Sequence, residues 1–576
     1  MIATVLTIEN IFPEDTDFEH LEYLKKIEKN VLIHLISFIN LKDGLDISNI
    51  ISDYKINQEV QSKINSIKYE DEKQVFLFNE YTKIKLAEIV LSNQKELNED
   101  SDLPVFEQEL LLLKIILKIN SEYYLEIEKP LLTKHIRTFK EFEEETINQY
   151  ILTQFQVFEL GLKENKLYEL LKLSYCTIYK LQYLLKFLEQ NEVLGNLNLE
   201  LLKFFNQKSN NDFVIEAKKA FGLIINAYHK NNYKFKISEG SLKILNSFII
   251  DDLEIEDNDF TSIKKKPVLF YNQTDFSIIN FFLFIDLFTR FLKFKVKELY
   301  ESLEIDKTHK LGTFFSYFPK KFSEEYLSEK ILNDIFSKPY YYKIQKTGTE
   351  RKNEPDFYVR YQNTIFLFEI KDLFINSKVK SSKSLDEILG EFNKKFVGKN
   401  QDVGIMQLIK HIELINNKKF QFDHLSNIKN NIKIYPIILV HDRILQAPGI
   451  NLKLNKIFKI EASKITTSHV IKDLVIMDID TLISIIDDIK DNHKAFIKHL
   501  DYHIKCMNSS KNLENFSQVE SKREQQFTKY IINKSLPFSN RIQAKIHKHK
   551  IISMFLNETI KTTPLPQGGS NQLKNQ

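Results

Sequence analysis

The sequence predicts an α+β protein of several domains: a mainly α-helical N-terminal half, then an α/β region with a mixed central sheet, and a helical C-terminal tail. Three observations lead to this fold class. Apolar residues recur every three or four positions through the first two hundred residues, as on the buried faces of helices. The 576 residues include only 13 Gly and 12 Pro, so the backbone has few forced turns. After Lys310, short β-type runs alternate with helical patterns.

The length suggests about three or four units of ~150 residues each. Composition and pattern shifts give the boundaries between them. We expect an acidic helical domain (1–200), a mixed, mainly helical region (201–310), an α/β domain (311–490), a basic helical extension (491–562) and a disordered tail (563–576).

The N-terminal half reads as a series of amphipathic helices from Asp17 to about Leu194. The acidic run at 141–145 is most simply a solvated helix face. Further on, a strand is expected at 267–271. The apolar stretch 276–294 contains charged residues that would cost several kcal/mol in lipid, so it predicts a buried core helix and no membrane contact.

The α/β domain should open with a helix over 323–337, with Ser323 as its N-cap. Three strands then follow, and the polar pair Gln362-Asn363 can turn the second strand into the third. A charged insertion, a helix and two buried strands complete the domain. The expected strands are 340–345, 357–361, 364–370, 432–440 and 473–479.

The cysteine content and the basic residues indicate the cellular environment of the protein. The two cysteines lie 330 positions apart, so neither a disulfide framework nor a zinc site is indicated. The N-terminus has no basic segment before its apolar residues, so no secretory signal is expected. Only seven of the 81 basic residues are Arg, a bias typical of AT-rich bacterial genomes. We therefore expect a cytoplasmic bacterial protein.

The net charge of +3 hides a gradient along the chain. Residues 1–150 carry 17 Lys/Arg against 29 Asp/Glu, whereas 311–490 carry 28 against 22 and 491–576 carry 14 against 6. Lysines near a polyanion release condensed counterions. Any nucleic acid is therefore expected to bind the second half of the chain.

Asp356 and Glu369 are the candidate metal ligands. A hairpin turning at Gln362-Asn363 would bring these two carboxylates together, and the Ile370 carbonyl could complete a site for Mg²⁺, a hard ion that keeps several waters. Lys371, two residues after Glu369 on the same strand, projects to the same face. It could deprotonate the attacking water, or act as a fixed charge.

The run Pro355-Asp356, twelve residues, then Glu369-Ile370-Lys371 resembles the PD-(D/E)xK nuclease superfamily, and the resemblance covers about 311–490. Pro355-Asp356 is the only Pro-Asp in the chain. The resemblance implies a restriction-endonuclease-like core, a helix Glu in the metal site (Glu329, with Glu325 in reserve) and a Gln on the helix after the lysine strand (Gln407). RecB-like members carry a Tyr where this chain has His411.

The resemblance implies Mg²⁺-dependent hydrolysis of phosphodiester bonds, with Mn²⁺ as a possible substitute, by a DNA endonuclease of phage defence or restriction. The alternative is a nuclease-like nucleic-acid-binding or scaffold protein that does not cleave. A third interpretation makes the hairpin an ordinary edge with a surface ion pair. The chain contains none of the P-loop, HExxH, GxSxG or CxxC patterns.

Two basic segments are candidates for phosphate contacts. Lys394 and Lys395 lie in the charged insertion, which could line a groove or be a solvated loop. The C-terminal run is more concentrated and has a helical pattern, with Arg541, Lys545, Lys548 and Lys550 as its candidate residues. DNA is favoured over RNA, and the helical N-terminal half could bind a protein partner or self-associate.

Overall fold

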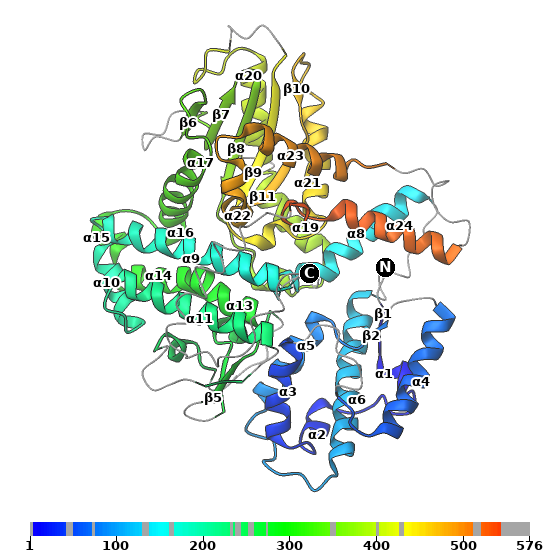
Figure 1. Ribbon diagram of the computed structural model, residues 1–576. Helices are drawn as coiled ribbons and strands as arrows, with labels where there is room; N and C mark the ends of the chain where they lie inside the picture. The colour runs from blue at the N-terminus through cyan, green and yellow to red at the C-terminus, as the bar shows by residue number, and fades with distance from the viewer. Residues whose placement is uncertain are drawn as a thin grey trace, which may run out of the picture.

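The computed structural model describes residues 4–41, 50–71, 75–128, 138–160, 166–230, 234–236, 243–250, 259–271, 275–345, 353–398, 403–425, 431–510 and 520–542. It is mainly helical, at 64% helix, with a helical N-terminal half, a mixed six-stranded sheet and C-terminal helices. The predicted fold class is confirmed. Figure 1 shows the N-terminal helices at the bottom, a middle layer of helices, and the large sheet at the top.

The N-terminal layer is built from helices around a short parallel strand pair, β1 (Thr4–Val5) and β2 (Val75–Phe76). Asn120 ties the layer together, because its side-chain amide donates to the carbonyls of Leu6 and Leu77. The helices are α1 (Ile8–Ile11), α2 (His20–Leu24), α3 (Lys29–Leu41), α4 (Tyr54–Asp71), α5 (Glu80–Ser92) and α6 (Val105–Tyr123), followed by the π-helical η2 (Tyr124–Glu128), α8 (Phe139–Phe155) and the short η3 (Phe158–Leu160).

The middle layer contains a small antiparallel sheet in the order β3-β5-β4. The expected strand at 267–271 is present as β4 (Val268–Phe270). The expected core helix at 276–294 is wrong at its start, because Asp275–Ile278 pairs with both neighbours as β5. The other elements are β3 (Phe235–Lys236), α9 (Lys166–Gln190), α10 (Gly195–Phe204), α11 (Asn210–Lys230), η4 (Lys243–Phe248), α12 (Thr261–Lys265), α13 (Phe281–Asp286), η5 (Leu287–Phe291), α14 (Leu292–Ser302) and α15 (Ile305–His309).

The helix before the large sheet starts nine residues before its predicted beginning. It runs without a break through α16 (Phe314–Phe318), the π-helical η6 (Pro319–Ser328) and α17 (Glu329–Ile335). The prediction that Ser323 is an N-cap is therefore wrong, and its hydroxyl instead donates to Asp372. Pro319 has no N–H for an ordinary helical bond, and the chain continues with wider turns in which the N–H of Glu329 donates to the Glu324 carbonyl.

The large sheet has the order β10-β9-β8-β7-β6, with β11 also paired to β9. The β6–β7 and β7–β8 pairs are antiparallel, whereas β8–β9 and both pairs on the far side of β9 are parallel. Gln362 makes the predicted hairpin turn with a φ of 51°. The strands are β6 (Tyr342–Gln345), β7 (Phe357–Tyr361), β8 (Thr364–Lys371), β9 (Lys433–Val440), β10 (Val470–Ile471) and β11 (Val475–Asp478).

Pro436 explains why β9 has two short partners on one side. The β9 carbonyls of Ile432 and Ile434 accept bonds from the β10 side, so Pro436, two residues on, faces the same side without an N–H. The pairing there shifts by one residue, from Val470↔Lys433 to Val475↔Ile437.

Asparagine side chains replace the missing ladder bonds on the outer edge of β11. Asn455 accepts from the Leu474 N–H at 2.9 Å. Asn451 accepts from the Ile476 N–H at 3.1 Å and donates to the Leu474 carbonyl at 3.0 Å. Both asparagines lie on α21 (Ile450–Ala462), which thereby satisfies the polar groups of this edge.

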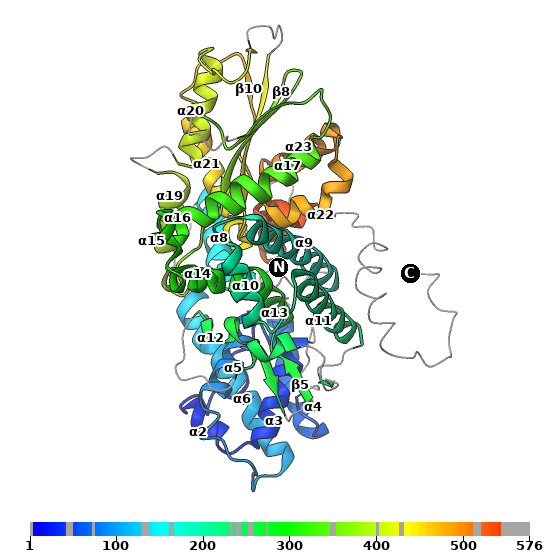
Figure 2. The same ribbon diagram turned by 90° about the vertical axis from the view of Figure 1, so that its left-hand side faces the viewer.

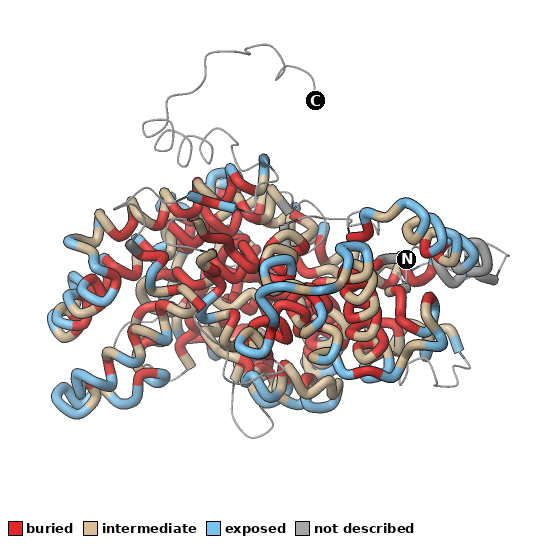
Figure 3. The backbone as a smooth tube through the Cα atoms, turned by 90° about the horizontal axis from the view of Figure 1, so that it is seen from below, coloured by how far each residue is buried: buried red, intermediate tan, exposed pale blue. Residues whose placement is uncertain are grey.

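The large sheet separates two hydrophobic cores, and Figure 2 shows helices on both of its faces. Tyr358, Ile365 and Leu367 belong to the core shared with α19 (Leu385–Phe396), α20 (Ile405–Asn416) and α21. Phe357, Phe366 and Phe368 belong to the opposite core, shared with α9, α17, α22 (Ile479–Ile489) and α23 (His493–Met507). Figure 3 shows the buried residues gathered inside these layers.

The acidic helix α8 packs on the basic C-terminal part of the chain. Phe139 stacks near Phe527 of α24 (Glu520–Ser535), with ring centroids 4.0 Å apart. Glu143 pairs with Lys534 at 2.5 Å, and Glu144 pairs with Lys456 at 2.5 Å and with Lys453. The prediction of a solvated face at 141–145 is therefore wrong for Glu143, whose side chain is 22% exposed, whereas Glu144 remains 42% exposed beside its two lysines. Figure 1 shows α8 beside α24.

No helix among the described residues is long and apolar enough to span a membrane. The remaining short helices are α18 (Ser377–Lys380), η8 (Arg443–Gln446) and α25 (Phe538–Arg541).

Candidate functional site

Asp356 lies immediately before β7 and joins the two strands of the hairpin. Its Oδ2 accepts a hydrogen bond from the Ile370 N–H at 2.9 Å, near the end of β8. Extending the β7–β8 register places Pro355 opposite Ile370. Proline has no N–H to donate, so the strand partner cannot occupy the Ile370 carbonyl. The Pro355-Asp356 pair therefore shapes this end of the hairpin.

Glu369 and Lys371 project from β8 to the face that also carries Ile365 and Leu367, because side chains alternate along a strand. The Lys371 Nζ lies 2.5 Å from Glu369 Oε1. Glu369 has 0% exposed surface and Asp356 has 5%. The three side chains singled out by the sequence thus meet in one buried site at the end of the hairpin.

The charge state of Lys371 follows from its neighbours. Burial lowers its pKa, but the carboxylates of Glu369, Asp356 and Glu324 together outweigh burial and raise the pKa above its usual value. Lys371 therefore carries its proton near neutral pH in this arrangement. Of the two roles considered for it, a fixed positive charge fits this geometry better than a general base.

Among the carboxylates of the preceding helix, Glu324 raises the pKa of Lys371. Glu329 is surrounded by other acids. Its burial, together with the carboxylates of Glu325 and Glu354, raises its pKa to about 8. The wide turns of η6 rotate the helix relative to an α-helical count, so spacing from the sequence could not identify Glu324.

Glu354 is a second acidic residue that the sequence analysis missed. It lies two positions before Asp356, is 5% exposed, and its Oε2 is buried without a hydrogen-bond partner in the described part of the chain. The Glu-Pro-Asp run was a signal that could have identified it. A buried carboxylate oxygen without a hydrogen-bond partner is costly, so this position favours a nearby cation.

Gln407 lies half-buried on α20, the helix that packs on β8. His411, one turn further along, is 2% exposed and packs near Phe420, with ring centroids 6.4 Å apart. The structure therefore puts Gln407 on the expected helix and on the same side of the sheet as Glu369.

The donor atoms at this site have the chemistry of a Mg²⁺ site. Asp356 and Glu369 offer carboxylate oxygens, and Ile370 offers a carbonyl that Pro355 cannot engage. Within the described ranges, no set of three or more His, Cys, Asp or Glu side chains is arranged to hold a metal ion. A cation bound here would therefore rely on two carboxylates, the carbonyl and water.

The candidate phosphate contacts have different surroundings. Lys394 is exposed, whereas Lys395 pairs with Glu391 at 3.2 Å. Arg541 donates to the carbonyls of Asn533, at 2.6 Å, and Lys534, at 2.9 Å, which caps the end of α24. Arg541 therefore has a structural role in this arrangement. Lys545, Lys548 and Lys550 lie outside the described residues.

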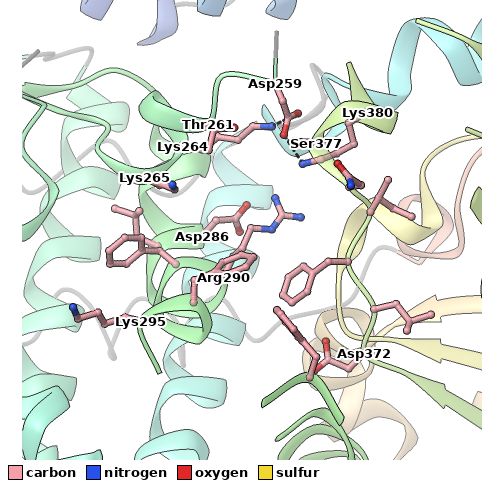
Figure 4. A pocket seen from close by; sticks show the side chains of 18 of the residues that line it. Asp259, Thr261, Lys264, Lys265, Asp286, Arg290, Lys295, Asp372, Ser377 and Lys380 are labelled. Atoms are coloured by element: carbon pink, nitrogen blue, oxygen red, sulfur yellow. Dashed lines mark hydrogen bonds and ion pairs between the residues drawn. The ribbon is translucent and has the colours of Figure 1, made fainter. Parts of the chain in front are cut away.

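A network of buried ion pairs anchors the segment that follows Lys371. Asp372 pairs with Lys293 at 2.5 Å, and Lys380 pairs with Asp259 at 2.9 Å. Figure 4 shows Asp259, Lys264 and Lys380 converging beside a pocket.

Glu159 connects this network to the N-terminal half. It has 0% exposed surface and lies 2.5 Å from Arg290, 2.9 Å from Lys264 and 3.5 Å from Lys380. These four residues come from η3, η5, α12 and α18. The network therefore fixes the layers of the molecule relative to the candidate site.

No protein-family model, curated protein or solved structure matches this chain.

Proposed function

We propose that this protein hydrolyses phosphodiester bonds of nucleic acid with Mg²⁺, as a DNA endonuclease. The observation that carries the proposal is the meeting of Asp356, Glu369 and Lys371 at one end of the β7–β8 hairpin. Two carboxylates and a lysine are the groups this reaction requires, since a charge must be neutralised and a water must be oriented.

Asp356 and Glu369 would hold the ion, together with the Ile370 carbonyl. A bound Mg²⁺ supplies a water of lowered pKa and offsets the negative charge that develops on the phosphate. Lys371 supplies a fixed positive charge beside these carboxylates, where it can orient the attacking water and stabilise the developing charge. Glu324, Glu329 and Gln407 are proposed as further contributors from the surrounding helices.

The order of elements supports the same proposal. A helix is followed by three antiparallel strands, further helices and a parallel strand. Asp356 immediately precedes the second of these strands, and Glu369 and Lys371 lie on the third. This arrangement resembles the PD-(D/E)xK nuclease core. By that resemblance we propose a role in bacterial phage defence or restriction, in the cytoplasm, where the two free cysteines suit a reducing environment.

A second candidate function is a nuclease-like protein that binds nucleic acid without cutting it. The complete burial of Glu369 favours it, because a phosphate cannot approach a carboxylate with 0% exposed surface without some opening. The two functions differ in catalysis alone, so a cleavage assay separates them.

The test incubates the purified protein with supercoiled plasmid, linear DNA and RNA, in Mg²⁺, in Mn²⁺ and in EDTA. Asp356→Ala and Lys371→Ala should each abolish metal-dependent nicking, while Asp334→Ala, which breaks an exposed pair with Lys330, should not. Nicking by the Asp356 and Lys371 variants at the wild-type rate would falsify the assigned site. Binding without cleavage of any substrate would favour the second candidate.

A further inference from the structure

Three phenylalanines from separate segments form an aromatic cluster: Phe294 on α14, Phe315 on α16 and Phe374 after β8. The ring centroids of Phe294 and Phe374 lie 5.1 Å apart, and Phe315 lies 6.5 Å from Phe294 and 6.2 Å from Phe374. Phe294 is 43% exposed and Phe315 is 47% exposed. A group of large rings that face solvent together usually marks a binding surface.

The cluster lines a pocket of about 890 Å³ between η5 and α14 on one side and the segment 372–377 on the other. Phe291, Leu373 and Ile375 extend its apolar lining. Figure 4 shows this pocket, with Lys265 and Lys295 on one side and Asp372 and Lys380 on the other. The volume lies within the range of sites that hold small organic groups, which includes nucleobases.

Lysines accompany the rings. The Lys293 ammonium lies 4.5 Å from the centroid of Phe374, and that of Lys297 lies 5.5 Å from the centroid of Phe315. The side chains that line the pocket include six cations and five carboxylates, and several of these are already paired with one another. Stacking on the rings would therefore contribute more to affinity than net charge.

The cluster lies close to the candidate site along the chain. Phe374 follows Lys371 by three residues, so their Cα atoms are at most about 11 Å apart. A strand with a base on the cluster would therefore pass near the end of β8, where Lys371 lies. The pocket is also lined by Lys395, one of the lysines identified from the sequence as a phosphate contact.

We propose that Phe294, Phe315 and Phe374 form a stacking platform for the unpaired bases of single-stranded nucleic acid, which leads the strand to the Asp356–Glu369–Lys371 site. This inference rests on the proposed function, since it names the substrate class of the same site. Bases inside a duplex already stack on their neighbours and are not accessible to these rings. The platform therefore selects single strands, loops or ends.

The test measures binding by fluorescence anisotropy in EDTA, where cleavage does not occur. The probes are a labelled twelve-nucleotide DNA without self-complementarity, its duplex, and the RNA of the same sequence. Wild type should bind the single strand more tightly than the duplex. The Phe294→Ala/Phe315→Ala double variant should bind single strands roughly 5- to 100-fold more weakly. Phe315→Trp, which keeps a stacking ring, should retain affinity.

Phe106→Ala is the matched control, because Phe106 is a 41% exposed phenylalanine on α6 in the N-terminal layer. Circular dichroism and thermal unfolding verify that the double variant folds as wild type does. Comparing the DNA with the RNA shows whether the platform accepts both kinds of unpaired base. If stacking dominates binding, the affinity for the single strand should fall only weakly as the salt concentration rises.

Equal single-strand affinity of the double variant and wild type would overturn the platform, as would tighter binding of the duplex. If sedimentation shows a wild-type dimer that the double variant loses, the cluster is an interface between copies and the proposal fails. The proposed function is judged separately by nicking in Mg²⁺. Cleavage without a phenylalanine effect overturns the platform alone, whereas a phenylalanine effect without any cleavage overturns the proposed nuclease alone.

Discussion

The ammonium nitrogen of Lys371 lies 2.5 Å from Glu369 Oε1, and Asp356 acts on the same lysine. Two buried carboxylates thus share one cation. The Lys371 ammonium stabilises the two carboxylates when no metal is bound. A divalent ion would compete with this ammonium for the same carboxylates. On the proposed function, binding of the ion would therefore loosen the pair between Lys371 and Glu369.

Replacing Lys371 should expose this competition. Lys371→Met leaves Asp356 and Glu369 buried without their shared cation, so we expect a loss of about 2–4 kcal/mol of unfolding free energy in EDTA. Urea denaturation measures the loss. Mg²⁺ should raise the melting temperature of this variant more than that of wild type. Lys330→Met, which removes an exposed pair with Asp334, serves as the control, and an equal loss in both variants would contradict the prediction.

Glu329 should make stability depend on pH. Its pKa is raised from 4.5 to about 8 on folding, because of burial and the nearby Glu325 and Glu354, so the folded state holds the proton more tightly than the unfolded state. Glu329 does not lower the free energy of unfolding below pH 4.5, where both states hold the proton. Between pH 4.5 and about 8 the free energy of unfolding falls, because the unfolded state loses this proton first. Glu329→Gln should therefore gain about 1–2 kcal/mol over wild type at pH 8.5, a figure discounted for partial solvation.

This pH profile is measured by urea denaturation between pH 5 and 8.5 in EDTA, so that no metal competes for the carboxylates. Glu413→Gln, at an exposed position on α20, is the control and should follow the wild-type curve. If wild type and Glu329→Gln run parallel throughout this range, Glu329 does not hold a proton in the folded state.

Glu159 should be a major contributor to stability. Glu159→Gln removes the charge that compensates Arg290, Lys264 and Lys380 in a fully buried position, so a loss of about 3–5 kcal/mol is expected. The control is Glu298→Gln. Glu298 pairs with Lys295 through a side chain that is 67% exposed, so this substitution should lower the free energy of unfolding by less than ~1 kcal/mol. A small loss for Glu159→Gln would show that these cations find other partners.

Arg541 should affect stability more than nucleic-acid binding. Arg541→Ala removes three donors to the carbonyls that end α24, which should cost about 1–2 kcal/mol in thermal or urea unfolding. The slope of log affinity against log salt should change little. By contrast, replacing Lys545, Lys548 and Lys550 together with Gln should reduce that slope by about 2–3 if each contacts a phosphate. The opposite pattern would assign the phosphate contact to Arg541.

The hairpin and the convergence of Asp356 with Glu369 were predictable because they depend on local rules. Alternating strands and a polar turn fix a register, and the register fixes which residues meet. The fold class followed in the same way from periodicity. The partner strand β9 was also predictable as an apolar run, apart from the break that Pro436 introduces in its neighbours.

The predictions that proved wrong concern features set by backbone geometry and by contacts between residues far apart in the sequence. Ser323 suggested a helix beginning at 323, because a sequence does not reveal that wide turns carry a helix through Pro319. The pair between Glu143 and Lys534 could not be foreseen, because the two residues lie 391 positions apart. Such pairs arise from packing that periodicity does not encode.

The asparagines that cover the outer edge of β11 affect how the protein behaves in a crowded solution. An open edge strand is a template on which another polypeptide can add a strand, the first step toward domain swapping or aggregation. Asn451 and Asn455 occupy the N–H groups of Leu474 and Ile476 that such a strand would need. Addition of a further strand along β11 is therefore blocked.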